Sequence, residues 1–203
     1  WGMADNEKIV KSRCISQQSL AKAYAFILST LRQNELKATA AFVTCFAVNP
    51  QLVKDNISLI EEMALLEPDW FGHILPAVKT MAMDGWTGAE FYRSMLNAGH
   101  EMAWHGTTHM PLSENTSSEA VALELELASR LFCDLDGMPK TIVFPRNQIG
   151  HLEALHNYGF ETYRSSSLSG AGKRVAGLLN EWNILDKGSA DKPCFREGWN
   201  ISP

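Results

Sequence analysis

The chain lacks the features that mark several specialised classes of protein. Among its 203 residues are four cysteines, none of which forms a C-x-x-C pair. This spacing argues against a zinc finger and against a thioredoxin-like redox centre. No cluster of Lys or Arg stands out, and the formal net charge is −5. Nucleic acid and acidic membrane surfaces are therefore disfavoured as partners.

Long hydrophobic runs are also missing. The longest strongly apolar stretch, residues 40–48, is too short to cross a bilayer and is typical of a buried strand. No signal peptide is evident, and Cys45 lies within this apolar stretch as a small hydrophobic residue would. We therefore expect a cytoplasmic protein without a transmembrane segment. Because the first residue is Trp1 rather than Met, we also expect the chain to be a fragment.

What the chain does contain is an alternation of helical and extended patterns, within a length that suits one domain over residues 1–203. Apolar periodicity predicts helices at residues 19–34, 87–99, 119–132 and 149–158. Buried extended runs predict strands at residues 36–48, 100–104, 140–144 and 160–164. This βα alternation predicts an α/β fold with a parallel sheet or a barrel.

The remaining segments have weaker patterns. Residues 49–83 form a mixed connection with two short helical patches, and the tail from Asp186 is expected to be irregular. Thr87 with Glu90, and Thr116 with Glu119, have the spacing of capping boxes. We expect each pair to open the helix that follows it.

Two histidines follow the second predicted strand, in the stretch GHEMAWHGTTHMPL. His105 and His109 are four residues apart, which places two imidazoles on one face of a helical turn. Such a pair suits Zn²⁺ or another divalent metal, and a carboxylate could complete the site. The alternative is a surface turn with two unconnected histidines, and the spacing alone does not exclude it. The H-E-x-x-H pattern of a zincin is absent.

The position of the pair favours the metal. In parallel α/β folds, catalytic residues gather at the carboxyl ends of the strands. His105 and His109 directly follow one predicted strand, and Arg146 directly follows the next. Two separate loops would thus bring a histidine pair and a cation to the same rim. We interpret His105 and His109 as metal ligands and Arg146 as a catalytic residue.

The order of these motifs resembles the polysaccharide deacetylase family, carbohydrate esterase family four. The stretch AGHEMAWHGTTHMPL is similar to the family's metal motif, H-S/T-x-x-H after a Gly-His-Glu strand. LKATAAFVTCFAV is similar to its second strand, and TIVFPRNQIGHLEALHNYGFETYR to the region of its third motif. The resemblance covers about residues 19–165.

The chain departs from the family pattern at several positions. Gly106 stands where the family has Ser or Thr, and the third motif has Pro145-Arg146-Asn147 instead of Arg-x-Pro-Tyr. The family's first motif, an Asp-Asp pair, is not in this chain. A branch of the family carries Asp-x-Glu shortly before Trp-Gly, so we expect the carboxylates upstream of Trp1, with Asp5 as the alternative within the chain. The last motif, a strand with a leaving-group histidine, is not evident.

The resemblance implies a distorted (β/α)7 barrel related to the TIM barrel, expected here to be incomplete at both ends. It implies a hydrolase that removes N-acetyl, or less often O-acetyl, groups from an acetylated saccharide. His105 and His109, with an aspartate, would hold Zn²⁺ or another divalent metal. Arg146 would position a carboxylate base, and a backbone N–H after it would bind the oxyanion.

Two other functions remain open. The first is a non-catalytic relative of the deacetylases that binds saccharide, which the missing carboxylate and leaving-group motifs would permit. The second is an unrelated metal hydrolase that uses the same two histidines. The sequence identifies neither the sugar nor the oligomeric state.

Overall fold

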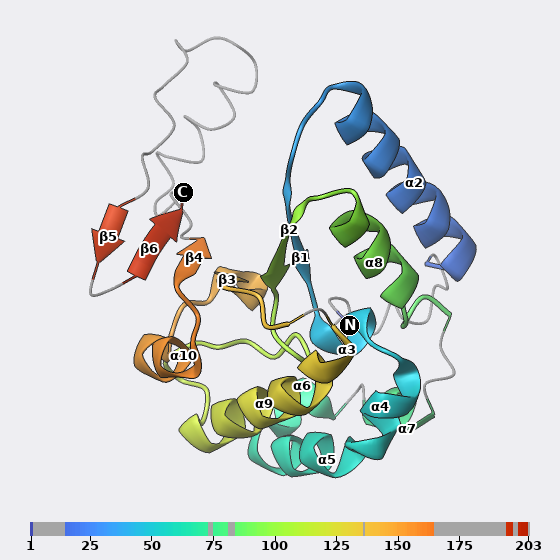
Figure 1. The fold of residues 1–203 in the computed structure, drawn as a ribbon. Helices are drawn as coiled ribbons and strands as arrows, with labels where there is room; N and C mark the ends of the chain where they lie inside the picture. Colours follow the sequence, from blue (N-terminus) through green and yellow to red (C-terminus); the bar gives the residue numbers. More distant parts are fainter. Residues whose placement is uncertain are drawn as a thin grey trace, which may run out of the picture.

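The structure is a computed structural model that describes residue 1 and residues 15–72, 75–80, 84–135, 137–164, 194–196 and 199–202. Six strands form one sheet, in the spatial order β1-β2-β3-β4-β6-β5 (Figure 1). They are β1 (Thr39–Phe42), β2 (Glu101–Trp104), β3 (Thr141–Val143), β4 (Thr162–Arg164), β5 (Cys194–Arg196) and β6 (Trp199–Ser202). Neighbouring strands are parallel except β5, which is antiparallel to β6.

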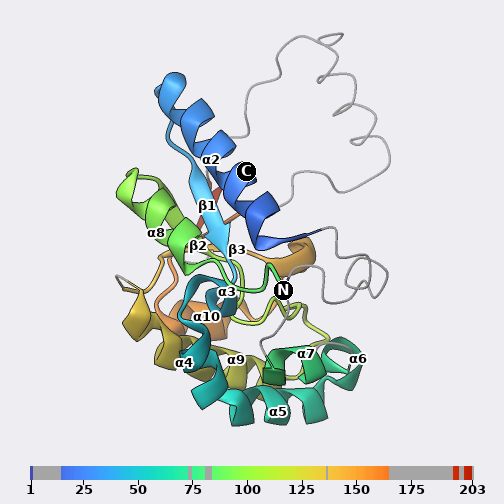
Figure 2. The same ribbon diagram turned by 90° about the vertical axis from the view of Figure 1, so that its right-hand side faces the viewer.

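Helices make up most of the connections between the strands. They are α2 (Gln17–Gln33), α3 (Thr44–Ala47), α4 (Pro50–Asp55), α5 (Ile57–Leu66), α6 (Pro68–Phe71), α7 (Leu75–Thr80), α8 (Ala89–Asn97), α9 (Ser118–Leu131) and α10 (Leu152–Tyr158), with short 3-10 helices η1 (Phe132–Asp134) and η2 (Pro145–Asn147). Helices α4 to α7 gather with α9 at one end of the molecule, and α2 lies beside α8 at the other (Figures 1 and 2). No helix in the described ranges is long and apolar enough to cross a membrane.

The α/β fold with a parallel sheet is confirmed, and one predicted strand is corrected. Residues 36–48 were expected to be extended throughout, but β1 ends at Phe42 and Thr44–Ala47 forms α3. A short apolar run does not distinguish a buried strand from a buried helix. The backbone N–H groups of Thr44 and Cys45 donate to the carbonyls of Gly106 and Thr107, which draws the chain away from the sheet.

Both expected capping boxes are wrong. The N-cap of α8 is Gly88, without a side-chain hydrogen bond. The N-cap of α9 is Ser117, whose hydroxyl accepts from the Ala120 N–H, while the Thr116 hydroxyl donates to the Pro111 carbonyl. The helix α9 is therefore capped by the hydroxyl of Ser117, one residue after the predicted cap Thr116.

The tail is more regular than expected. Residues Trp199–Ser202 form β6, which pairs with β4 in parallel register, so the sheet continues beyond the last strand that the sequence predicted. This strand contains no histidine and does not supply the leaving-group residue of the family's last motif. Residues 175–185, whose sequence VAGLLNEWNIL predicts a helix or a helix followed by a strand, lie outside the described residues.

The core packs against the middle of the sheet. Trp104, at the end of β2, is 1% exposed, and its ring stacks on Phe160 with 4.8 Å between centroids. Its indole Nε1 donates to the hydroxyl of Thr44 at 3.1 Å. Ile142 of β3 and Leu131 of α9 are also fully buried. The carboxyl end of β2 is thereby fixed between the core and the start of α3.

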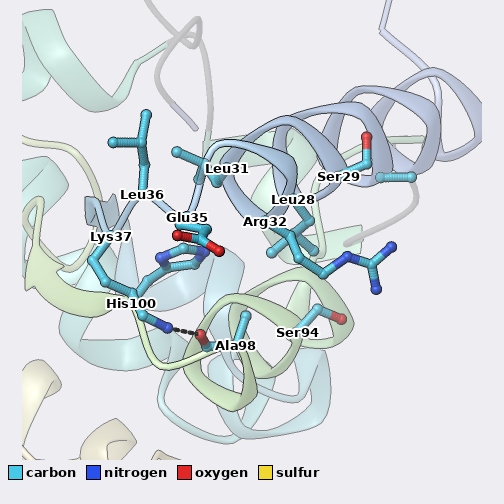
Figure 3. Close-up of a pocket in the computed structure, with 11 residues that line it drawn as sticks. Leu28, Ser29, Leu31, Arg32, Glu35, Leu36, Lys37, Ser94, Ala98 and His100 are labelled. Carbon is cyan, nitrogen blue, oxygen red and sulfur yellow. Dashed lines mark hydrogen bonds between the residues drawn. The ribbon is translucent and has the colours of Figure 1, made fainter.

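A groove of about 530 Å³ lies between α2 and α8, with His100 among its lining residues (Figure 3). It is at the opposite end of the strands from His105 and His109. Leu28 and Leu31 of α2 line it together with Leu36. Across the groove, the Lys37 ammonium donates to the carbonyl of Ala98 at 2.6 Å. The groove is reached from the amino ends of β1 and β2, whereas catalytic groups of parallel folds gather at the carboxyl ends.

Candidate metal centre

His105 is held by backbone on two sides. Its N–H donates to the Phe42 carbonyl at the end of β1, at 2.9 Å. Its ring Nδ1 lies 2.6 Å from the Val143 carbonyl at the end of β3. Because a carbonyl only accepts, Nδ1 carries the proton and Nε2 keeps its lone pair. Burial lowers the pKa of His105, so the ring is neutral, as a metal ligand must be.

His109 lies beside His105. The two ring centroids are 4.8 Å apart and the planes are inclined by 68°. The Nδ1 atom of His109 is buried and has no hydrogen-bond partner among the described residues. Burial, repulsion from His105 whenever that ring is protonated, and the Trp1 amino group lower the pKa of His109 to about 4. A buried nitrogen with a lone pair and no partner is unusual in a folded protein and fits a site for a bound group.

The pair is carried by a loop that is fixed at both flanks. On one flank, the carbonyls of Gly106 and Thr107 accept from the first two N–H groups of α3. On the other, the N–H groups of Thr107 and Thr108 donate to Oε1 of Glu124, at 2.6 and 2.9 Å. Hydrogen bonds to α3 and to α9 therefore hold the loop between the histidines from both sides.

Glu124 is one of two residues at the site that the sequence analysis did not predict. It is 0% exposed, on the buried face of α9, and its Oε2 accepts from the Thr108 hydroxyl at 2.9 Å. Burial raises the pKa of its carboxyl to about 7, against the opposing effect of the hydrogen bonds from Thr108 and Thr107. The signal was present, because Glu124 interrupts the apolar stripe formed by Val121, Ala128 and Leu131.

The backbone at Gly106 requires a glycine. Its φ is +76°, and a Cβ at this position would lie 3.1 Å from the Pro145 ring and 3.3 Å from the Glu124 carboxylate. A β-carbon would meet both close contacts and the strain of a left-handed backbone. Glycine therefore lets the histidine loop lie directly against the buried carboxylate of α9.

Arg146 reaches the same rim through an aromatic residue. Trp70 of α6 lies next to His109 with 5.9 Å between ring centroids and 29° between planes. The guanidinium carbon of Arg146 lies 5.0 Å from the centroid of Trp70, within the range of a cation–π contact. The structure thus brings all three predicted site residues together, with Trp70 as an unpredicted member.

Backbone strain concentrates in the same two loops. Five non-glycine residues of the described chain have positive φ, and four of them follow β2 or β3: His109, Arg146, Asn147 and His151. Such conformations cost on the order of 1–3 kcal/mol each and cluster at functional sites. The strain indicates that packing around the rim is strong enough to hold these residues in place.

The two loops also contact each other directly. A Cβ on Gly150 would lie 2.5 Å from the Glu114 nitrogen and 2.6 Å from the Leu112 carbonyl oxygen, so only glycine fits this crossing. Next to it, Nε2 of His151 is 3.0 Å from the carbonyls of both Ser113 and Thr116. His151 is therefore a structural link between the two loops.

The donor set is a half-site. Within the part of the chain that the structure describes, no third His, Cys, Asp or Glu joins the pair in a metal-binding group. Asp5, the expected internal alternative, lies outside the described residues. Two neutral imidazoles with available lone pairs fit a Zn²⁺ ion that takes further ligands from elsewhere.

No protein-family model, curated protein or solved structure matches this chain.

Acidification should destabilise the metal-free protein through His109. Its folded-state pKa of about 4 lies below the value of 6.5 for the unfolded chain, so its contribution to stability is present above pH 6.5 and is lost as the pH falls through 4. Glu124, whose pKa is raised, contributes in the opposite direction. The wild-type protein and His109→Gln are therefore compared in urea titrations at pH 7 and pH 4. Between these pH values, the free energy of unfolding of His109→Gln should fall by roughly 3 kcal/mol less than that of the wild type. Parallel pH profiles for the two proteins would contradict this assignment.

Proposed function

We propose that this chain is a metal-dependent hydrolase that removes N-acetyl, or less often O-acetyl, groups from a saccharide. One observation carries the proposal. At the carboxyl end of a parallel strand, His105 has its Nδ1 occupied by a backbone carbonyl, and the adjacent His109 has a buried Nδ1 without a partner. A hydrogen bond on the second ring nitrogen is the usual support of a metal-bound histidine.

A divalent metal held by His105 and His109 would supply a Lewis acid that polarises the acetyl carbonyl. The side chains of this protein would fix where the reaction occurs. The Val143 carbonyl orients the His105 ring, and Trp70 packs on the ring of His109. Arg146, on the outer face of the rim, would position the carboxylate base. Asp5, the candidate for this base within the chain, lies outside the described residues.

The strand order supports a TIM-like barrel as the scaffold. Strands β1, β2, β3 and β4 are neighbours in the order of the chain, as in a sheet that winds in one direction. A doubly wound sheet would instead reverse direction near its first strand. We propose a barrel of which β1 to β4 and β6 form one continuous wall.

A groove beside the rim supports a saccharide as the substrate. It has a volume of about 260 Å³, and the ring of Trp70 lines it together with Asp69, Asn115 and Gln148. An aromatic ring offers a surface for the C–H face of a sugar, and the carboxylate and amides offer partners for its hydroxyls. The groove continues directly from the ring that packs on His109.

Removal and return of the metal test the proposal. The purified full-length protein should release acetate from N-acetylated oligosaccharides, lose this activity after treatment with a chelator, and recover it with added Zn²⁺. Acetate release is measured by an enzyme-coupled assay, with O-acetylated oligosaccharides, a peptide and a phosphate ester as parallel substrates. Turnover of the peptide or phosphate ester alone would support an unrelated metal hydrolase. Zinc binding with every acetylated sugar left intact would support the non-catalytic relative.

A further inference from the structure

A buried carboxylate lies under the proposed metal site without taking part in it. Glu124 is 0% exposed, and it forms no ion pair within the described residues. A buried acid without a cation is costly, and natural proteins keep one where its hydrogen bonds serve a purpose. For Glu124, these bonds go to one short loop.

Glu124 forms hydrogen bonds to Thr107 and Thr108, in the loop between the two histidines. Its Oε1 accepts from two successive backbone N–H groups, of Thr107 and Thr108, and its Oε2 accepts from the Thr108 hydroxyl. The Thr107 hydroxyl donates to the Glu124 backbone carbonyl at 3.0 Å. Four hydrogen bonds thus tie both residues to one turn of α9, and both are 0% exposed.

The same loop sets the separation of the imidazoles. Gly106, Thr107 and Thr108 are the only residues between His105 and His109, and the loop turns through φ of +76° at Gly106 and +67° at His109. Any relaxation of Thr107 or Thr108 would change the 4.8 Å between the ring centroids. A ligand misplaced by 1 Å is enough to weaken a metal site.

We infer that Glu124 is a positioning residue, whose carboxylate fixes the Gly106–Thr108 loop and thereby the relative placement of His105 and His109. This inference rests on the proposed metal site for its effect on zinc binding. The placement of the two rings is independent of any metal. Glu124 therefore acts through the histidines and touches neither substrate nor metal.

Graded variants test the inference with Zn²⁺ alone as the probe. Glu124→Gln keeps an Oε1 acceptor for both backbone N–H groups but loses the acceptor for the Thr108 hydroxyl, so zinc affinity should fall a few-fold. Glu124→Ala removes every side-chain acceptor and should weaken zinc binding by about 10- to 100-fold, the usual cost of a lost supporting group. The matched control is Glu126→Gln on the exposed face of α9, where the side chain pairs with Arg130. It should leave zinc affinity unchanged.

A metal-free measurement separates this inference from the proposed function. In long-range ¹H–¹⁵N spectra of the histidine rings, Glu124→Gln should shift the resonances of His105 and His109 and leave those of His156 on α10 in place. If the wild-type protein binds no Zn²⁺ but the ring shifts occur, the metal proposal fails and the positioning role stands. If the rings of a folded Glu124→Gln protein do not move, or if Glu124→Gln and Glu124→Ala bind Zn²⁺ as the wild type does, Glu124 is only a structural residue and the inference is overturned.

Discussion

The His105→Ala variant should release acetate at least about a thousandfold more slowly than the wild-type protein, because loss of a ligand removes the metal from a site with only two described donors. The variant should also bind Zn²⁺ too weakly to measure by isothermal titration. The effect is expected to be larger than for any residue of the groove, since in the proposed function the groove side chains would contact the saccharide but not the reacting carbonyl.

The control for this variant is His156→Ala, which removes a histidine from α10 outside the rim. It should retain activity and zinc affinity. The thermal unfolding of His105→Ala must be followed in parallel, because the ring also binds the Val143 carbonyl. A folded His105→Ala protein with full activity would show that the histidine pair is not the metal centre.

Truncation of Trp104 to alanine should lower the free energy of unfolding by about 3–5 kcal/mol, a large part of the total stability of a domain. The ring is 1% exposed and stacks on Phe160, so its removal leaves a cavity at the carboxyl end of β2. The change also removes the indole hydrogen bond to Thr44, the first residue of α3. Chemical denaturation with urea measures the loss.

Trp104→Phe separates the two contributions. It retains an aromatic ring and loses the indole N–H, so the loss should fall to roughly 1–2 kcal/mol, from the missing hydrogen bond and a smaller cavity. Equal losses for Trp104→Phe and Trp104→Ala would mean that the hydrogen bond to Thr44, not the packed ring, holds this end of the sheet.

The sequence was sufficient for the α/β fold because its strands and helices differ in period. It was also sufficient to place His105, His109 and Arg146 on one rim, since each follows a parallel strand at its carboxyl end. It was insufficient within residues 40–48, where every side chain is apolar or small and the switch from β1 to α3 depends on hydrogen bonds to Gly106 and Thr107. Those partners are distant in the sequence, so local patterns do not contain the information.

Two members of the site, Trp70 and Glu124, were not predicted, and they differ in whether the sequence carries a signal for them. Trp70 comes from the mixed connection between β1 and β2, and only the folded chain brings it against His109. Glu124, in contrast, was visible as an acid on the apolar stripe of α9, next to Val121 and Ala128. A charged residue at such a position must find partners inside the protein. The helical period alone is enough to predict a buried carboxylate at position 124.

The crossing at Gly150 has a consequence for how the rim fluctuates. Because Gly150 packs against the backbone of Leu112 and Glu114, and His151 binds the Ser113 carbonyl, opening of one loop exposes packed backbone of the other and breaks a hydrogen bond to it. The two loops form one cooperative opening unit, so their amide hydrogens should exchange with deuterium at a common opening free energy. The side chains of both loops would then become accessible in a single event.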